Sequence, residues 1–188
     1  MPLDAIVRTY IRRIRPRAQT EIDRFVSQPS LRAAIRNAAL AVNSRGKRYS
    51  HQRRLAKVAL ERALDALSKH ARAIQKAHDF DDLFHLIDTA LEPIPGLGEL
   101  YVYDTTLRIG AKLNLFPDKV YLHAGTRLGA RALGLCTAAT LKMSELPKEF
   151  RALKPHEIED VLCIFKDELK ASAAPRVTLD IFERSWCD

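Results

Sequence analysis

Asp104 and His123 are two of the side chains in the second half of the sequence that could take part in acid–base chemistry. A carboxylate can stabilise a developing positive charge, and an imidazole can position water or transfer a proton near neutral pH. Each residue also has a structural interpretation. Asp104 precedes Arg108 by four residues, so on a helix the two can form an ion pair worth roughly a few tenths of a kcal/mol, and His123 can satisfy a helix end. We favour the ion pair for Asp104 and keep both residues as candidate catalytic groups.

A break rich in proline and glycine, PIPGLG at residues 93–98, separates two helical patterns. Glycine lets the backbone adopt otherwise strained dihedrals and approach an anion closely. The free N–H groups at the start of the following helix then point at that anion. An ordinary helix–helix turn is the alternative. We favour a phosphate-binding turn, formed by Pro95, Gly96, Leu97 and Gly98.

The positive charge of the chain is concentrated in its first third. The sequence has 188 residues and a net charge of +8. Residues 1–60 contain 14 Lys/Arg against 3 Asp/Glu, a charge of +11, and the remaining 17 against 20 give −3. Such asymmetry is typical of a surface that meets a polyanion, with a simple solubility charge as the alternative.

The densest cationic stretch is RGKRYSHQRRLAK, residues 45–57. Ser50 resembles the N-cap of a long helix, which would place Arg53 and Arg54 in its first turn. Arginines there oppose the helix dipole unless an anion binds. A solvated basic turn is the alternative. The candidate DNA contacts in this stretch are Arg45, Lys47, Arg48, His51, Gln52, Arg53 and Arg54.

Further cations lie on helical patterns later in the chain. Arg108 and Lys112 are four residues apart on one polar face and are candidate phosphate contacts. Residues 125–131, GTRLGAR, form a second glycine-rich helix start with Arg127 and Arg131 as candidate contacts. The glycines there could instead allow close helix packing.

Apolar residues recur every three or four positions almost throughout, so the sequence predicts an all-α fold containing a helix-hairpin-helix element. We expect one domain over 1–188, with a basic part at 1–78, a hairpin and candidate-site part at 79–135 and C-terminal helices at 136–188. The only strand-like run is TLDIF in the C-terminal tail. The expected helices cover about 3–15, 21–26, 31–42, 50–78, 80–91, 99–114, 126–135, 145–153 and 155–170.

The order helix, hydrophobic-Pro-Gly-hydrophobic-Gly, helix resembles the helix-hairpin-helix DNA-binding element. Over about residues 80–125 the chain is similar to the helix-hairpin-helix DNA glycosylases, in which a loop after the second helix carries a catalytic aspartate. The resemblance implies that role for Asp118, in LFPDKVYLH. The alternative for Asp118 is the N-cap of a following helix.

The resemblance also implies the kind of chemistry. Lyase-competent members carry a lysine at the position of Leu100, so this chain would be monofunctional and use an activated water. A flipped base needs aromatic neighbours, for which Tyr101, Tyr103 and Tyr121 are candidates, with burial in the core as the alternative. The three scattered cysteines offer neither an iron–sulfur cluster nor a CxxC zinc motif, so no cofactor or metal is expected.

We therefore expect a cytoplasmic protein that binds double-stranded DNA and removes a damaged or modified base, such as one from foreign or phage DNA. A non-catalytic helix-hairpin-helix module and a helical interaction protein are the alternatives. No apolar run approaches the roughly 18 residues that cross a bilayer, so no membrane association is expected.

Overall fold

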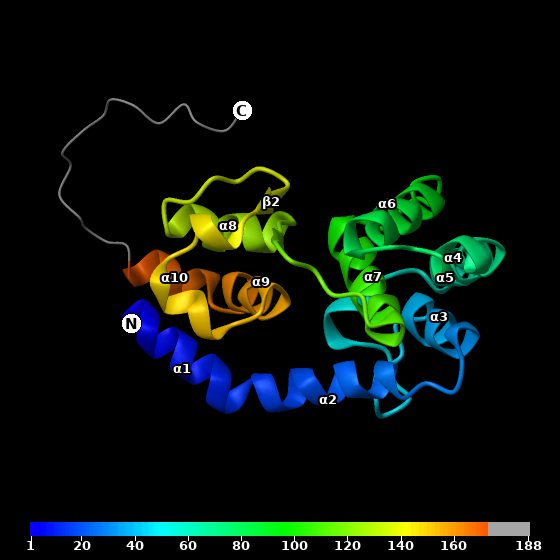
Figure 1. The fold of residues 1–188 in the computed structure, drawn as a ribbon, viewed down its shortest axis with the longest axis horizontal. Coiled ribbons are helices and arrows are strands. Elements are labelled where there is room, and N and C mark those ends of the chain that lie inside the picture. Colours follow the sequence, from blue (N-terminus) through cyan, green and yellow to red (C-terminus); the bar gives the residue numbers. More distant parts are fainter. Residues whose placement is uncertain (173–188) are drawn as a thin grey trace. The chain divides into compact units, whose positions relative to one another are not determined.

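A computed structural model describes residues 1–172 and is mostly helical, which confirms the helical fold class (Figure 1). Within these residues it has ten α-helices, three short 3-10 helices and one two-stranded sheet. The α-helices are α1 (Leu3–Arg13), α2 (Arg15–Val26), α3 (Leu31–Ala39), α4 (Lys57–Lys69), α5 (Ala71–Gln75), α6 (Phe80–Leu91), α7 (Glu99–Leu113), α8 (Ala124–Ala132), α9 (Pro155–Ile164) and α10 (Lys166–Ser172). The short elements are η1 (Ser50–Gln52), η2 (Met143–Glu145), η3 (Lys148–Ala152), β1 (Val120–Tyr121) and β2 (Thr140–Leu141).

The chain forms two compact units. One is the continuous segment Pro16–Pro117, called the hairpin unit here because it contains PIPGLG. The other, called the discontinuous unit, combines Met1–Arg15 with the chain that begins at Asp118. The boundaries of these units fall at residues 15 and 117, whereas the parts expected within the single domain met at residues 78 and 135.

The core of the hairpin unit is built from α3, α4, α6 and α7. Leu60 and Leu67 of α4 and Ile74 of α5 are fully buried there, and α6 contributes Leu83 and Ile87. Asp79 caps α6 by accepting a hydrogen bond from the backbone N–H of Asp82 at 2.8 Å.

The discontinuous unit has its own core, in which α1, α8 and α9 pack with η3 and the small sheet. Ile6, Phe150 and Leu162 are buried there. The hydroxyl of Tyr10 donates to the Asp160 carboxylate at 2.8 Å. Burial, reinforced by that carboxylate, raises the pKa of Tyr10 well above its usual range.

Glycine permits the close contact between α8 and α9. A Cβ at Gly129 would lie 2.2 Å from the carbonyl oxygen of Leu162. At Gly125 it would lie 3.0 Å from the Cys163 sulfur. The packing interpretation of the glycine-rich run is confirmed at Gly129, because a side chain there would push the two helices apart.

The single long helix expected over 50–78 is wrong. Ser50–Gln52 forms only a 3-10 turn, and α4 begins at Lys57. Side-chain bonds hold the intervening backbone in a turn, since the Arg48 guanidinium donates to the Leu55 carbonyl at 2.8 Å and Gln52 is drawn into the interior. Arg53 and Arg54 therefore precede α4, and the expected conflict with its dipole does not arise.

Other boundaries also differ from the expectation. Pro16 lies in the first turn of α2, where proline is tolerated, so α2 begins earlier than expected. The helix expected over 145–153 consists of 3-10 turns, and the one expected over 155–170 divides into α9 and α10. The pair β1–β2 was not predicted, and TLDIF lies outside the described residues. None of the described helices combines the length and apolar character needed to cross a bilayer.

Candidate nucleic-acid interface

PIPGLG is an exposed turn that connects α6 to α7, two helices that pack against each other (Figure 1). Gly96 adopts φ +87°, a left-handed conformation that favours glycine. Ile94 is buried and Leu97 packs against the core, while Pro95, Gly96 and Gly98 face solvent. The turn is thus anchored by its apolar residues and open at its glycines.

The start of α7 is a helix N-terminus at the surface. Gly98 is its N-cap, and Tyr101 and Val102 donate the first backbone bonds of the helix to the Gly98 carbonyl. The N–H groups before Tyr101 point outward, as at any helix start, and favour an anion. Glu99 also lies in this first turn, and its carboxylate would compete with a bound anion for the positive end of the helix dipole.

The cationic stretch begins with a tight turn. Val42 and Arg48 pair across it as an isolated bridge, and Gly46 adopts φ +69°. The Asn43 side-chain oxygen accepts the backbone N–H groups of Arg45 and Lys47 at 2.9 and 3.1 Å. Arg45 and Lys47 are consequently presented to solvent on a fixed backbone.

Beyond the turn, Gln52 and His51 connect the cationic stretch to α7. Gln52 is 2% exposed, and its amide donates to the Asp104 carboxylate at 2.8 Å. His51 contacts the same carboxylate oxygen at 2.7 Å. The Arg108 guanidinium donates to both Asp104 and the Gln52 side-chain oxygen, each at 3.1 Å. The predicted ion pair between Asp104 and Arg108 is confirmed, but it lies within a larger cluster.

Arg108 is more deeply buried than its expected role as a phosphate contact requires. Its side chain is 9% exposed, and its guanidinium lies 3.9 Å from the centre of the Tyr49 ring. Burial raises the pKa of Tyr49, whose hydroxyl donates to Glu21 at 2.7 Å. Burial acts to raise the pKa of Glu21, but bonds from Ser44 and Tyr49 outweigh it and lower that pKa overall. The Arg108 side chain therefore makes its contacts within the interior of the hairpin unit.

Lys112 is likewise occupied within the hairpin unit. Its ammonium donates to the carbonyls of Val26 and Gln28 at 3.2 and 2.5 Å. These carbonyls lie at the C-terminal end of α2, where a cation offsets the helix dipole. Among the candidate cations of this unit, those exposed to solvent are Arg45, Lys47, Arg53 and Arg54, while Arg48 is half-buried.

The tyrosines considered for a base pocket lie in the packed interior. Tyr101 is 3% exposed, and its hydroxyl donates to the Ala39 carbonyl at 2.6 Å, joining α7 to α3. Tyr103 is buried with its ring edge-on to Phe80. Tyr121 is buried in β1 of the discontinuous unit. For Tyr101 and Tyr103, the structure therefore agrees with the alternative of burial in the core.

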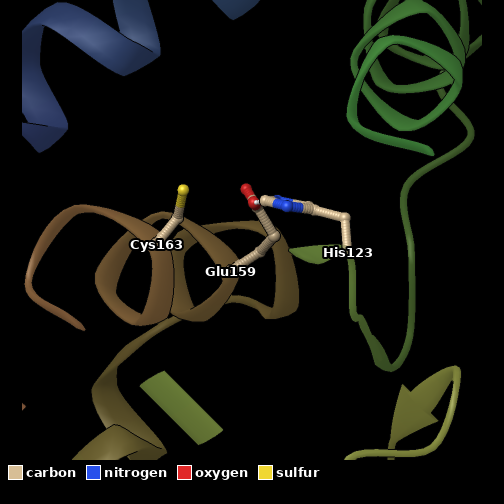
Figure 2. Close-up of side chains that lie close together, drawn as sticks. All are labelled: His123, Glu159 and Cys163. Atoms are coloured by element: carbon tan, nitrogen blue, oxygen red, sulfur yellow. Dashed lines mark hydrogen bonds and ion pairs between the residues drawn. The ribbon is translucent and has the colours of Figure 1, made fainter. Parts of the chain in front are cut away.

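In the discontinuous unit, Asp118 and His123 have contrasting environments. Asp118 is exposed in a bend before β1, and the N-cap alternative for it is wrong because His123 caps α8. His123 is 3% exposed, and its Nε2 lies 2.5 Å from the Glu159 carboxylate (Figure 2). On α8, Arg131 is exposed and Arg127 is half-buried. The helix-end interpretation of His123 is confirmed.

Several residues of the cluster around Arg108 were outside the sequence-based prediction. Tyr49 and Glu21 were not candidates, and Gln52 was expected at the surface. Their partners lie far along the chain, so no local spacing indicated the contacts.

No protein-family model, curated protein or solved structure matches this chain.

Proposed function

We propose that the hairpin unit binds duplex DNA through the exposed turn at residues 93–98 and the cationic stretch at residues 43–54. One observation carries this proposal: α7 begins at the exposed turn, and the side chains of Asp104 and Arg108 on the same helix hold the cationic stretch through Gln52. Two elements suited to phosphate are thus fixed to a single helix.

Electrostatics support the same proposal. Residues 43–54 include five Lys/Arg and no Asp or Glu, and Arg45, Lys47, Arg53 and Arg54 are exposed. Their field attracts a polyanion, while the N–H groups at the start of α7 can bond a phosphate oxygen without reading the base sequence. Binding should therefore weaken steeply with salt as counterions are released.

Gly98→Asp is expected to weaken binding to duplex DNA by about tenfold, or about 1.4 kcal/mol. The new carboxylate would stand at the N-cap of α7, where the proposal puts a phosphate. The fold should tolerate it, because a Cβ at Gly98 meets no atom within 4 Å and aspartate is a favourable N-cap. Fluorescence anisotropy of a labelled duplex, at several salt concentrations, measures the change.

Gly98→Asn is the matched control, since it has the same size and capping ability without the charge. It should bind duplex DNA more tightly than the Gly98→Asp variant, because its side chain caps the helix without repelling a phosphate. Equal affinities of the Asp and Asn variants would remove the hairpin from the interface, and absent or salt-insensitive binding by the unchanged protein would exclude the proposal.

Base excision is the second candidate function, and the environment of Asp118 favours it. That carboxylate is exposed and makes no hydrogen bond or ion pair within residues 1–172, whereas Asp104 is held by three side chains. Asp118 is thus available to stabilise positive charge on a deoxyribose and to orient water. We propose it as the catalytic residue of a cytoplasmic monofunctional DNA glycosylase.

Incubation with duplexes that carry damaged or phage-type modified bases should produce abasic sites, detected by alkaline strand cleavage. Asp118→Asn should abolish them without loss of DNA binding, and Asp104→Asn should retain activity where the protein stays folded. Intact binding without abasic sites across the panel would leave a non-catalytic DNA-binding module. An active Asp118→Asn variant would exclude Asp118 from the mechanism.

A further inference from the structure

Three potential metal ligands meet in the discontinuous unit, at the contact between α8 and α9. His123 caps the start of α8, and Glu159 and Cys163 stand one helical turn apart on α9 (Figure 2). One ligand atom from each residue lies within 4.8 Å of the other two. His123 and Glu159 are buried, Cys163 is half-buried, and Cys163 carries a thiol. The cluster therefore combines nitrogen, oxygen and sulfur donors.

The backbone brings these side chains together in a defined way. The His123 backbone N–H donates to the Thr126 hydroxyl at 2.7 Å, which fixes the residue at the start of α8. Gly125 leaves room for the Cys163 sulfur, which would lie only 3.0 Å from a Cβ at that position. The spacing of Glu159 and Cys163 places both on one face of α9. The donor set is thus held by helix packing as well as by the side chains themselves.

We propose that His123, Glu159 and Cys163 bind a zinc ion. Thiolate, imidazole and carboxylate together are a donor set that suits zinc, whereas calcium and magnesium prefer oxygen ligands alone. A deprotonated cysteine and a carboxylate would neutralise the two charges of the ion, which favours binding in a buried site. Three protein ligands leave a fourth tetrahedral position for water.

The distances are compatible with this geometry. Two ligands of a tetrahedral zinc lie roughly 3.3–3.8 Å apart when the metal bonds are about 2.0–2.3 Å long. The observed separations include the 2.5 Å contact between His123 and Glu159 and remain within 4.8 Å. Small rotations of these side chains would bring all three donors to one ion.

Metal binding changes where two protons reside. In the structure, Nδ1 of His123 accepts the Gly125 backbone N–H at 3.3 Å, so the ring proton is assigned to Nε2 and is donated to Glu159. A zinc ion on Nε2 would require the ring proton to move to Nδ1. Nδ1 could then no longer accept the Gly125 N–H, and that long bond would be lost. The thiol proton of Cys163 would be released to solvent, so zinc affinity should fall as the pH is lowered.

The test is a metal titration of the purified full chain after treatment with a chelator and a reductant. Cobalt should bind with one equivalent and produce a thiolate-to-cobalt charge-transfer band, and zinc should displace it because zinc binds such sites more tightly. Zinc should also raise the melting temperature, since it binds the folded state. DNA plays no part in this measurement, so its outcome is independent of the proposed DNA binding.

Cys163→Ser should remove the charge-transfer band and weaken zinc binding by more than about tenfold. Glu159→Gln provides a second variant, because glutamine can still accept a hydrogen bond from His123 while lacking the charge. Circular dichroism shows that each variant is folded. His85→Ala, at an exposed histidine of α6, is the matched control and should bind zinc as the unchanged protein does. Substoichiometric binding, a cobalt spectrum without the thiolate band, or unchanged zinc affinity in both cluster variants would overturn the proposal.

Discussion

Replacing Arg108 by methionine is expected to lower the free energy of unfolding by about 3 kcal/mol. Methionine fills a similar volume but leaves the Asp104 carboxylate, 16% exposed, without its guanidinium partner. The Gln52 side-chain oxygen and the face of the Tyr49 ring lose their contacts as well. This loss is at the lower end of the range for breaking a buried ion pair, because Asp104 keeps the bonds from His51 and Gln52. Urea denaturation followed by circular dichroism measures the change.

Arg53→Met is the matched control, because it removes the same charge from an exposed position of the cationic stretch and should change stability by less than about 0.5 kcal/mol. Arg108→Lys should recover only part of the loss, since lysine cannot bond Asp104 and Gln52 while stacking on Tyr49. A cost below about 1 kcal/mol for Arg108→Met would show that the buried cluster does not hold α7 to the cationic stretch.

The free energy of unfolding is expected to fall by about 2 kcal/mol between pH 7 and pH 5 through His156 alone. Burial lowers the pKa of this residue to about 4; the neighbouring Glu157 acts to raise it, and Lys154 and Arg15 act to lower it. The pKa of the unfolded histidine is near 6.5. Between these values the unfolded chain binds the additional proton, so stability decreases as the pH falls below 6.5 and the loss is complete near pH 4.

The dependence of the free energy of unfolding on pH, compared between variants, separates the contribution of His156 from those of other titrating groups. His156→Gln should flatten the decline by about 2 kcal/mol over this pH range, whatever it does to stability at pH 7. His70→Gln, at an exposed histidine, should leave the decline unchanged. Equal slopes for the unchanged protein and the His156→Gln variant would contradict a buried, neutral His156.

Several parts of the fold could be predicted because their causes are local. The break between α6 and α7 follows from the Pro and Gly residues between two apolar repeats. The pair of Asp104 with Arg108 follows from a spacing of four residues. The expected helix across 50–78 failed because Gln52 and Arg48 make contacts that no propensity describes.

In the candidate sites too, local spacing predicted some features, while the long-range contacts appeared only in the tertiary structure. The sequence presented Arg108 and Lys112 as cations on a polar face, yet the fold places Gln52, Tyr49 and backbone carbonyls around them. His123 was recognised as a candidate, but its partner Glu159 was not, since the two are far apart in the sequence.

By itself, the sequence determined the helical periodicity, the glycine turn at residues 93–98 and the concentration of positive charge in the first third of the chain. These depend on residue types and on spacings of three or four, which operate within a few turns of helix. Only the tertiary structure decided which cations remain exposed, which become buried, and that Glu159 and Cys163 meet His123. Burial and long-range contact arise when helices pack, and the close packing at Gly129 depends on a surface of α9 that no local pattern specifies.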